Sequence, residues 1–174
     1  PVNPTNYPPT LAPIADCLIH AGCALAVTNS ATDLAAPPHP LAFSLDPGAP
    51  AGATIDSATG VISWPTTAAS AGTTNTITVR VSQTTLSNLS DMKSFTVVVV
   101  PPPMLQPLTF ANGAAQLTWN AVAGQRYRVQ YKSSLAAANW TDLAPDLTAT
   151  GSTISVTDAP GLSPQGYYRI LIME

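Results

Sequence analysis

Hydrophobic and polar residues alternate with a period of two in several short runs of this chain. In the run 76–81, Ile77, Val79 and Val81 share one face, while the residues between them are polar. The run 95–99 repeats the pattern. A period of two is typical of a strand that is buried on one face. Runs of this kind, separated by turn signals about every ten residues, predict an all-β sandwich.

Residues 13–100 hold enough of these runs for one sandwich of about seven strands. Asp46-Pro47-Gly48 and the segment 57–60 carry residues that favour turns. The predicted strands cover 23–28, 41–45, a short segment beginning at 55, 61–64, 76–81 and 95–99. Residues 1–12 are proline-rich and lack periodicity, so we predict an extended N-terminal arm there.

Three consecutive prolines, 101–103, follow the last of these strands. Proline has no N–H to give to a strand ladder and favours the polyproline II conformation. We therefore place a linker at 101–107 and a second domain at 108–174. The predicted strands of this domain cover 108–111, 115–119, 126–132, 140–143, 152–157 and 167–172. The predicted fold is two tandem Ig-like or fibronectin-III-like β-sandwiches.

The second sandwich has no predicted last strand. The segment 167–172 has the pattern of the sixth strand of seven, and too few residues follow it for another. A sandwich without an edge strand leaves a row of unpaired N–H and C=O groups beside an open apolar groove, which another chain could cover. The predicted subunit contacts are Tyr168, Ile170 and Ile172 at this edge and Val2, Tyr7 and Leu11 in the arm.

The composition supports β-structure and narrows the choice of partners. Charged residues make up 9% of the chain, against about 25% in an average globular protein. The net charge is −3 and no basic cluster occurs, which disfavours nucleic acid as a partner. No apolar run reaches the ~18 residues of a membrane span. Because the chain begins without Met, we predict a processed protein that is secreted or held at the cell surface.

The two cysteines, Cys17 and Cys23, are close in sequence. Their C-x5-C spacing fits neither the C-x-x-C redox motif nor the usual zinc spacings. A small disulfide loop, which would imply an oxidising compartment, is the leading interpretation. Two thiols, or pairing between subunits, are the alternatives.

Catalytic residues and cofactors are not predicted. The two histidines, His20 and His39, lie in predicted loops and are expected to be solvated. No Gly-x-Ser-x-Gly motif occurs, and the only glutamate is Glu174. We therefore expect that the chain is not an enzyme.

The first domain resembles the Putative Ig, cadherin-like, modules of bacterial surface proteins. The matching segments are 14–16, 20–22, 31–33, 41–45, 48–56, 59–64 and 79–81. The second domain resembles the C-terminal fibronectin-like module of large secreted proteins of Verrucomicrobia and Planctomycetes. Its matching segments are 117–119, 124, 127–131, 140–143 and 167–170. The resemblance implies scaffolding, adhesion or surface attachment, with no catalytic residues and a chain that commonly ends after the Tyr-Tyr-Arg strand.

The resemblance also raises the question of calcium, because cadherin-like repeats often bind Ca²⁺ through carboxylates at strand ends. Asp33 and Asp56 are the candidate ligands, although Leu34 stands where an acidic residue is usually expected after Asp33. The alternative is that each carboxylate caps a turn. We predict no metal site.

Carbohydrate binding requires exposed aromatic side chains, and only 6% of this chain is aromatic. Trp64 and Trp119 lie within strand patterns and are predicted to be core residues. Trp140 is the glycan candidate, and its alternative role is packing at a strand edge.

These patterns predict a non-catalytic extracellular structural protein. Copies of it would assemble into a fibre or surface layer by β-strand complementation, since a head-to-tail contact that does not close builds filaments. The alternatives are a monomeric spacer or attachment module of a larger secreted enzyme or adhesin, and a carbohydrate-binding module whose partner is cell-surface polysaccharide.

Overall fold

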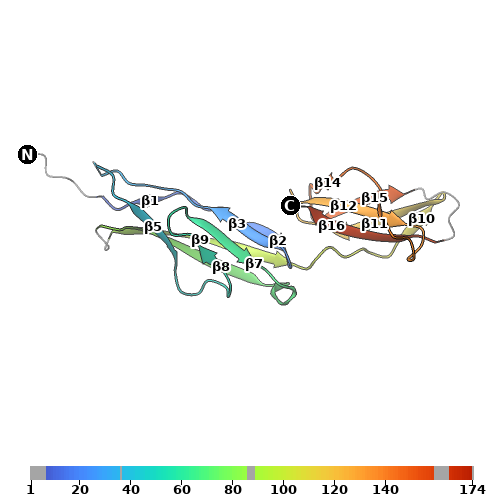
Figure 1. Ribbon diagram of the computed structural model, residues 1–174, viewed down its shortest axis with the longest axis horizontal. Helices are drawn as coiled ribbons and strands as arrows, with labels where there is room; N and C mark the ends of the chain where they lie inside the picture. Colours follow the sequence, from blue (N-terminus) through green and yellow to red (C-terminus); the bar gives the residue numbers. More distant parts are fainter. Residues whose placement is uncertain (1–6, 36, 86–88, 159–164, 174) are drawn as a thin grey trace, which may run out of the picture. The chain divides into compact units, whose positions relative to one another are not determined.

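A computed structural model describes residues 7–35, 37–85, 89–158 and 165–173. Their regular structure is β, apart from one 3-10 turn at Ala68–Ser70. The chain divides into two compact units, Pro1–Pro101 and Pro102–Glu174 (Figure 1). Each unit is a β-sandwich, so the predicted fold class is confirmed.

The first unit has two main sheets. One has the order β2-β9-β8-β5, formed by Cys17–His20, Ser90–Val100, Thr74–Gln83 and Leu41–Leu45. The other has the order β3-β7-β6, formed by Ala24–Thr28, Val61–Pro65 and Thr54–Ile55. A short pair joins β1 (Thr10–Leu11) to β4 (Ala31–Thr32). These strand pairs are antiparallel except for β2 and β9, which run parallel.

The alternating runs of the sequence form the core of this unit. Ile77 on β8 and its ladder partner Phe95 on β9 are both buried between the sheets. Val79 and Val97 are fully buried beside them. Burying one such side chain contributes about 1.5–3 kcal/mol. Trp64 on β7 is also buried, as predicted.

The predicted N-terminal arm ends inside the first unit, which corrects its boundary. Leu11 is 1% exposed and belongs to the core, and its N–H donates to the Asp91 carboxylate at 2.9 Å. The prediction that Leu11 contacts another subunit is therefore wrong. In the sequence, Pro8 and Pro9 argue against a strand at this place. A proline can, however, lie just before a strand without interrupting it. Val2, the first predicted contact of the arm, lies outside the described residues.

The second unit also has two sheets. One has the order β10-β11-β15, formed by Thr109–Ala111, Ala114–Asn120 and Thr153–Asp158. In the other, β12 (Arg126–Lys132) pairs on one side with β13 (Thr141–Asp142) and β14 (Leu147–Thr148), and it also pairs with β16 (Tyr167–Met173). Asn112 and Gly113 form the predicted hairpin turn between β10 and β11, and both have positive φ.

The core of the second unit lies between these sheets and includes Trp119, as predicted. Its ring meets that of Tyr127 edge to face, with the ring centroids 6.1 Å apart. The Tyr127 hydroxyl accepts the N–H of Val122 at 2.7 Å. Leu105, which was assigned to the linker, packs against this core and bridges to Trp119, so the predicted linker extends too far into the second unit.

Candidate functional site

The strand β16 is the candidate assembly site, and it lies at the edge of its sheet. It pairs with β12 along its whole length, from Lys132 opposite Tyr167 to Arg126 opposite Met173. Within the described residues β12 is its only ladder partner. Since backbone groups in a strand point alternately to the two sides, about every second N–H and C=O of β16 faces away from β12.

The inward face of β16 holds the three predicted subunit contacts on this strand. Tyr168, Ile170 and Ile172 pack against the core but stay only partly buried. The Tyr168 hydroxyl donates to Asp158 at 2.8 Å, and its ring lies 5.3 Å from that of Tyr131. Burial, and then the bond to Asp158, raises the pKa of the Tyr168 phenol well above its usual range. The three side chains therefore lie together at the open edge, and their role in subunit contact stays a prediction.

The outward face of the same sheet carries four of the six cationic side chains of the whole chain. They are Arg126, Arg128 and Lys132 on β12 and Arg169 on β16. Asp146 accepts hydrogen bonds from Arg126 at 2.7 Å and from Arg128 at 2.7 Å. The Arg128 guanidinium, through this bond and its charge, holds the pKa of Asp146 below its usual range.

Trp140, the predicted glycan residue, is half-buried on this outward face. The Lys132 ammonium lies 4.8 Å from the centre of its ring and the Arg169 guanidinium lies 4.5 Å from it. Arg169 also donates to the side chain of Gln130 at 2.7 Å. These contacts match the alternative prediction of packing at a strand edge. Sugar binding at Trp140 stays a prediction.

The two calcium candidates occupy separate loops of the first unit. The carboxylate of Asp33 is 2% exposed and accepts the N–H groups of Ala35 and His39 and the side-chain amide of Gln83. These bonds, with that of Ala35 the strongest, lower the pKa of Asp33. Asp56 accepts the N–H groups of residues 58 and 59 and so caps its own turn. The alternative interpretation, turn capping, describes both carboxylates.

Metal and membrane sites can be assessed for the described part of the chain. There, no group of three His, Cys, Asp or Glu side chains lies close enough together to hold a metal ion. No helix in those residues has the length and hydropathy needed to cross a membrane.

The predicted disulfide is not formed, since Cys17 and Cys23 are both thiols. Cys17 begins β2, and the N–H of Cys23 donates to the carbonyl of His20 to close the turn that follows this strand. A strand rises about 3.3 Å per residue, so β2 carries the chain about 10 Å from Cys17 to His20 before the turn at Cys23 begins. Pairing between subunits stays a prediction.

The expectation that both histidines are solvated is wrong for His20. Its side chain is 1% exposed, and Nδ1 lies 2.6 Å from the carbonyl oxygen of Pro101. Burial lowers the pKa of His20. His39 is partly buried, with Nδ1 3.1 Å from the Asp33 carboxylate. The sequence carried no signal for His20, because a strand end that packs beneath a following segment looks like a loop.

Comparison with solved structures gives distant likenesses, three of which follow. The EC1-2 fragment of human protocadherin-24 aligns with a TM-score of 0.44 and 13% identity, over 74% of this chain and 66% of that structure. The human desmocollin-1 ectodomain aligns with a TM-score of 0.40 and 15% identity, over 97% of this chain and 36% of that structure. The EC1-4 fragment of Drosophila N-cadherin aligns with a TM-score of 0.41 and 11% identity, over 95% of this chain and 49% of that structure. The chain thus spans less than two thirds of each of these structures.

Family comparison is more specific for the first unit. No protein with a curated description matches the chain significantly. The model of the family described as "Putative Ig domain" matches residues 8–100, which is more than half of the chain and agrees with the resemblance stated for this domain. It ends before the second unit, whose likeness to a fibronectin-like module stays a prediction. Ig-like and cadherin-like modules are typically non-catalytic and extracellular. The chain belongs to the Putative Ig domain family.

Proposed function

We propose that this protein is a non-catalytic extracellular structural subunit that assembles with copies of itself by strand addition at β16. The observation that carries the proposal is the single ladder partner of a seven-residue strand in the described part of the second unit. A strand from another copy would pair with its outward backbone groups and cover its partly buried aliphatic side chains.

The energetics favour such an addition over leaving the edge in water. Each added backbone hydrogen bond contributes about 0.5–1.5 kcal/mol net. Covering Ile170 and Ile172, which are half-buried now, would add roughly 25 cal/mol for each Å² of apolar surface removed from water. The low content of charged residues also reduces repulsion between closely packed copies.

The structure narrows the choice of donor segment. Leu11 fills the core of its own unit, and the carbonyl of Tyr7 accepts a hydrogen bond from Gln83 at 2.9 Å. The backbone from Tyr7 onward is therefore engaged within its own copy, whereas the Tyr7 side chain is 49% exposed and its role in subunit contact stays a prediction. Pro1 and Pro4 have no N–H to donate to a ladder, which disfavours the sequence 1–6 as a donor strand. An exposed edge strand of a second copy is the better donor.

A pair of proline variants at neighbouring positions tests the proposal. One of the two residues Ile170 and Leu171 directs its N–H toward β12 and the other directs it outward, because the direction alternates along a strand. Proline at the outward position blocks strand addition and spares the β12–β16 ladder, whereas proline at the inward position breaks that ladder.

We expect filaments or large oligomers of the wild-type chain by negative-stain electron microscopy and light scattering. Of Ile170→Pro and Leu171→Pro, one should stay folded by circular dichroism and remain monomeric. Monodisperse wild-type monomers at high concentration would contradict the proposal and favour the monomeric spacer. A folded proline variant that assembles as well as the wild type would exclude β16 as the joining edge.

A further inference from the structure

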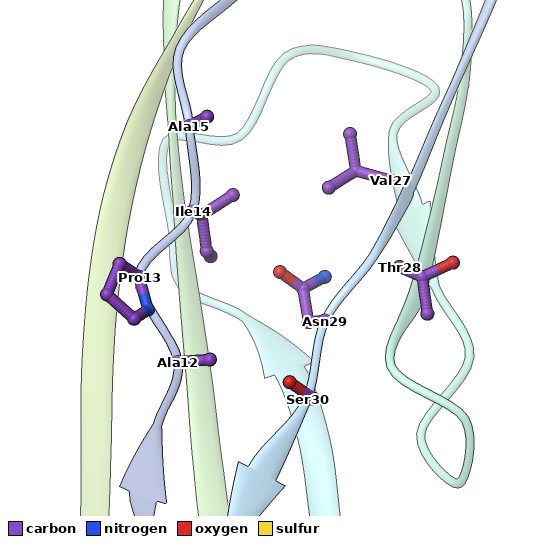
Figure 2. A pocket seen from close by; sticks show the side chains of 8 residues that line it. All are labelled: Ala12, Pro13, Ile14, Ala15, Val27, Thr28, Asn29 and Ser30. Atoms are coloured by element: carbon purple, nitrogen blue, oxygen red, sulfur yellow. The ribbon is translucent and has the colours of Figure 1, made fainter.

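A cavity of about 130 Å³ opens in the first unit where two neighbouring segments separate. β1 and β4 are paired, and the N–H of Ala12 donates to the carbonyl of Ser30 at 2.9 Å. Beyond this bond the chain 13–16 crosses to β2 and the sheet of β9, while β3 stays with β7. The cavity lies between residues 12–15 and residues 27–30 (Figure 2).

The cavity contains a buried hydrogen-bond acceptor that lacks a donor. Asn29 is 6% exposed, and its Nδ2 donates to the carbonyl of Gly60 at 2.7 Å. Its Oδ1 has no hydrogen-bond partner among the described residues. Leaving such an acceptor unsatisfied is unfavourable, because burial removes the hydrogen bonds that the oxygen would make to water. A ligand that brings an N–H or O–H to this oxygen would remove that cost.

The remaining walls favour an aliphatic group. Figure 2 shows Ile14 pointing into the cavity from one segment and Val27 from the other, with the amide of Asn29 between them. None of the eight lining residues is charged. At the ~30 Å³ that a water molecule occupies in the liquid, the space has room for about four waters or one aliphatic side chain. The site thus suits an uncharged side chain attached to a backbone that offers an N–H.

The strand next to the cavity can supply the backbone pairing. β3 is at the edge of its sheet and pairs with β7, from Ala24 opposite Pro65 to Thr28 opposite Val61. No ladder partner occupies its other side within the described residues. β1 covers only the continuation of this edge at β4. An added strand could therefore run along β3 and end at the cavity.

The charges of the two units favour a contact between unlike units of two copies. The first unit has Arg80 and Lys93 against five aspartates and carries −3. The second has four cations against three aspartates and Glu174 and carries no net charge, with all four cations on the β12–β16 sheet. Two first units would repel each other, whereas a first and a second unit would not.

We propose that β16 of one copy adds to the β3 edge of a second copy, where an aliphatic side chain of β16 enters the cavity between Ile14 and Val27 and a backbone N–H donates to Asn29 Oδ1. This inference rests on the proposed self-assembly and names its acceptor site. The β16 edge belongs to the second unit and the β3 edge to the first. The contact is therefore head-to-tail and propagates into a filament.

Site-directed cross-linking tests the pairing directly, in a background where Cys17 and Cys23 are replaced by serine. Chains with Leu171→Cys are mixed with chains with Thr28→Cys on β3 and treated with a short bis-maleimide. The matched control is Thr54→Cys on β6, which is exposed at the opposite edge of the same sheet. We expect covalent dimers with Thr28→Cys and at most a tenth of that yield with Thr54→Cys. Equal yields at the two edges would overturn the inference.

A blocking variant gives a second readout. Ala15→Trp places a large ring at the cavity from an exposed position, and Ala58→Trp places the same ring on an exposed turn of the same unit. We expect the dissociation constant for self-association to rise at least tenfold with Ala15→Trp and to stay unchanged with Ala58→Trp, with both variants folded by circular dichroism.

The outcomes separate this inference from the proposed function. A wild-type chain that does not assemble contradicts both. Assembly that needs an open β16 edge but is unaffected by Ala15→Trp and gives no cross-link to β3 overturns only the acceptor site.

Discussion

The strand β8 of the first unit and the strand β16 of the second have different neighbours. In the first unit β8 pairs with β5 on one side and with β9 on the other, whereas in the second unit β16 pairs with β12 alone in the described residues. β8 alternates apolar and polar residues in the sequence, whereas β16 is apolar and aromatic except for Arg169. The inward residues of β8, namely Ile77, Val79 and Val81, have no exposed surface. Those of β16, namely Tyr168, Ile170 and Ile172, remain partly exposed.

The difference shows that alternation alone does not complete burial. Side chains on a strand are shielded by the opposite sheet and also by the strands on both sides of their own. When one neighbouring strand is lacking, the inward residues keep contact with water along that flank. A partly exposed inward face on an otherwise regular strand is therefore a sign of a position that another strand can occupy.

The largest effect that separates the two strands is the cost of truncating an inward isoleucine. We expect Ile77→Ala to lower the free energy of unfolding of the first unit by about 2–5 kcal/mol, as for a fully buried side chain. Ile170→Ala in a monomeric sample should cost the second unit only about 1–2 kcal/mol, because much of that side chain is already in water. Urea titrations of the full chain, with NMR signals of each unit followed separately, measure both values.

The assembled protein supplies the control for this pair. If another copy covers β16, the cost of Ile170→Ala should increase on assembly, while that of Ile77→Ala should not change. Equal costs for the two substitutions in the monomer would show that the edge of β16 is closed within its own copy.

Much of this fold could be predicted because strands and hairpin turns have recognisable patterns of neighbouring residues. The expected runs 76–81, 126–132 and 167–172 lie within or coincide with β8, β12 and β16, and Asn112-Gly113 forms the expected turn. In each case the period of two, the run of apolar residues or the turn chemistry depends on residues close in sequence. The cadherin-like resemblance of the first unit was predicted on similar grounds and agrees with the family match.

The wrong predictions concern contacts between distant parts of the chain. Leu11 looked like part of an arm because its core partners and Asp91 come much later in the sequence. His20 looked solvated for the same reason, since Pro101 accepts its hydrogen bond. The predicted disulfide is not formed, and the short Cys17–Cys23 segment holds the strand β2, which begins at Cys17, and the turn that follows it. The role of Asn29 could not be predicted from the sequence. It lines a cavity only because residues 12–15 and 27–30 separate in the folded unit.

Acid should lower the stability of the first unit more than that of the second. We expect this difference in stability to be smaller than the one caused by core truncation. In the first unit four carboxylates have pKa values lowered mainly by hydrogen bonds that they accept; these are Asp33, Asp46, Asp56 and Asp91. In the second unit the pKa of Asp146 is lowered, chiefly by the hydrogen bond from Arg128. A lowered carboxyl pKa gives stability that is present above the unfolded value of about 3.9 and is lost as the pH falls through the folded value.

His20 extends the pH dependence of the first unit to milder acid. Burial lowers its pKa, so its contribution is complete above the unfolded value of about 6.5 and declines as the pH falls below it. We therefore expect the urea midpoint of the first unit to fall between pH 7.5 and 5.5, while that of the second unit stays constant until about pH 4. His20→Gln should remove the change above pH 5. A first unit with the same midpoint at pH 7.5 and 5.5 would show that His20 does not act in this way.

The smallest expected effect concerns Trp140 on the outward face of the β12–β16 sheet. Trp140→Ala should lower the stability of the second unit by about 1–2 kcal/mol, because each cation–π contact, with Lys132 and with Arg169, contributes about 0.5–1 kcal/mol. The first unit should be unaffected. Trp140→Leu keeps an apolar side chain without the ring, so it isolates the cation–π contribution from simple packing. Affinity electrophoresis in soluble polysaccharide then separates the two interpretations of this residue. Retardation of the wild type that is lost in both variants would make the ring a sugar platform, whereas equal mobility of all three would leave it as a packing residue of the β12–β16 sheet.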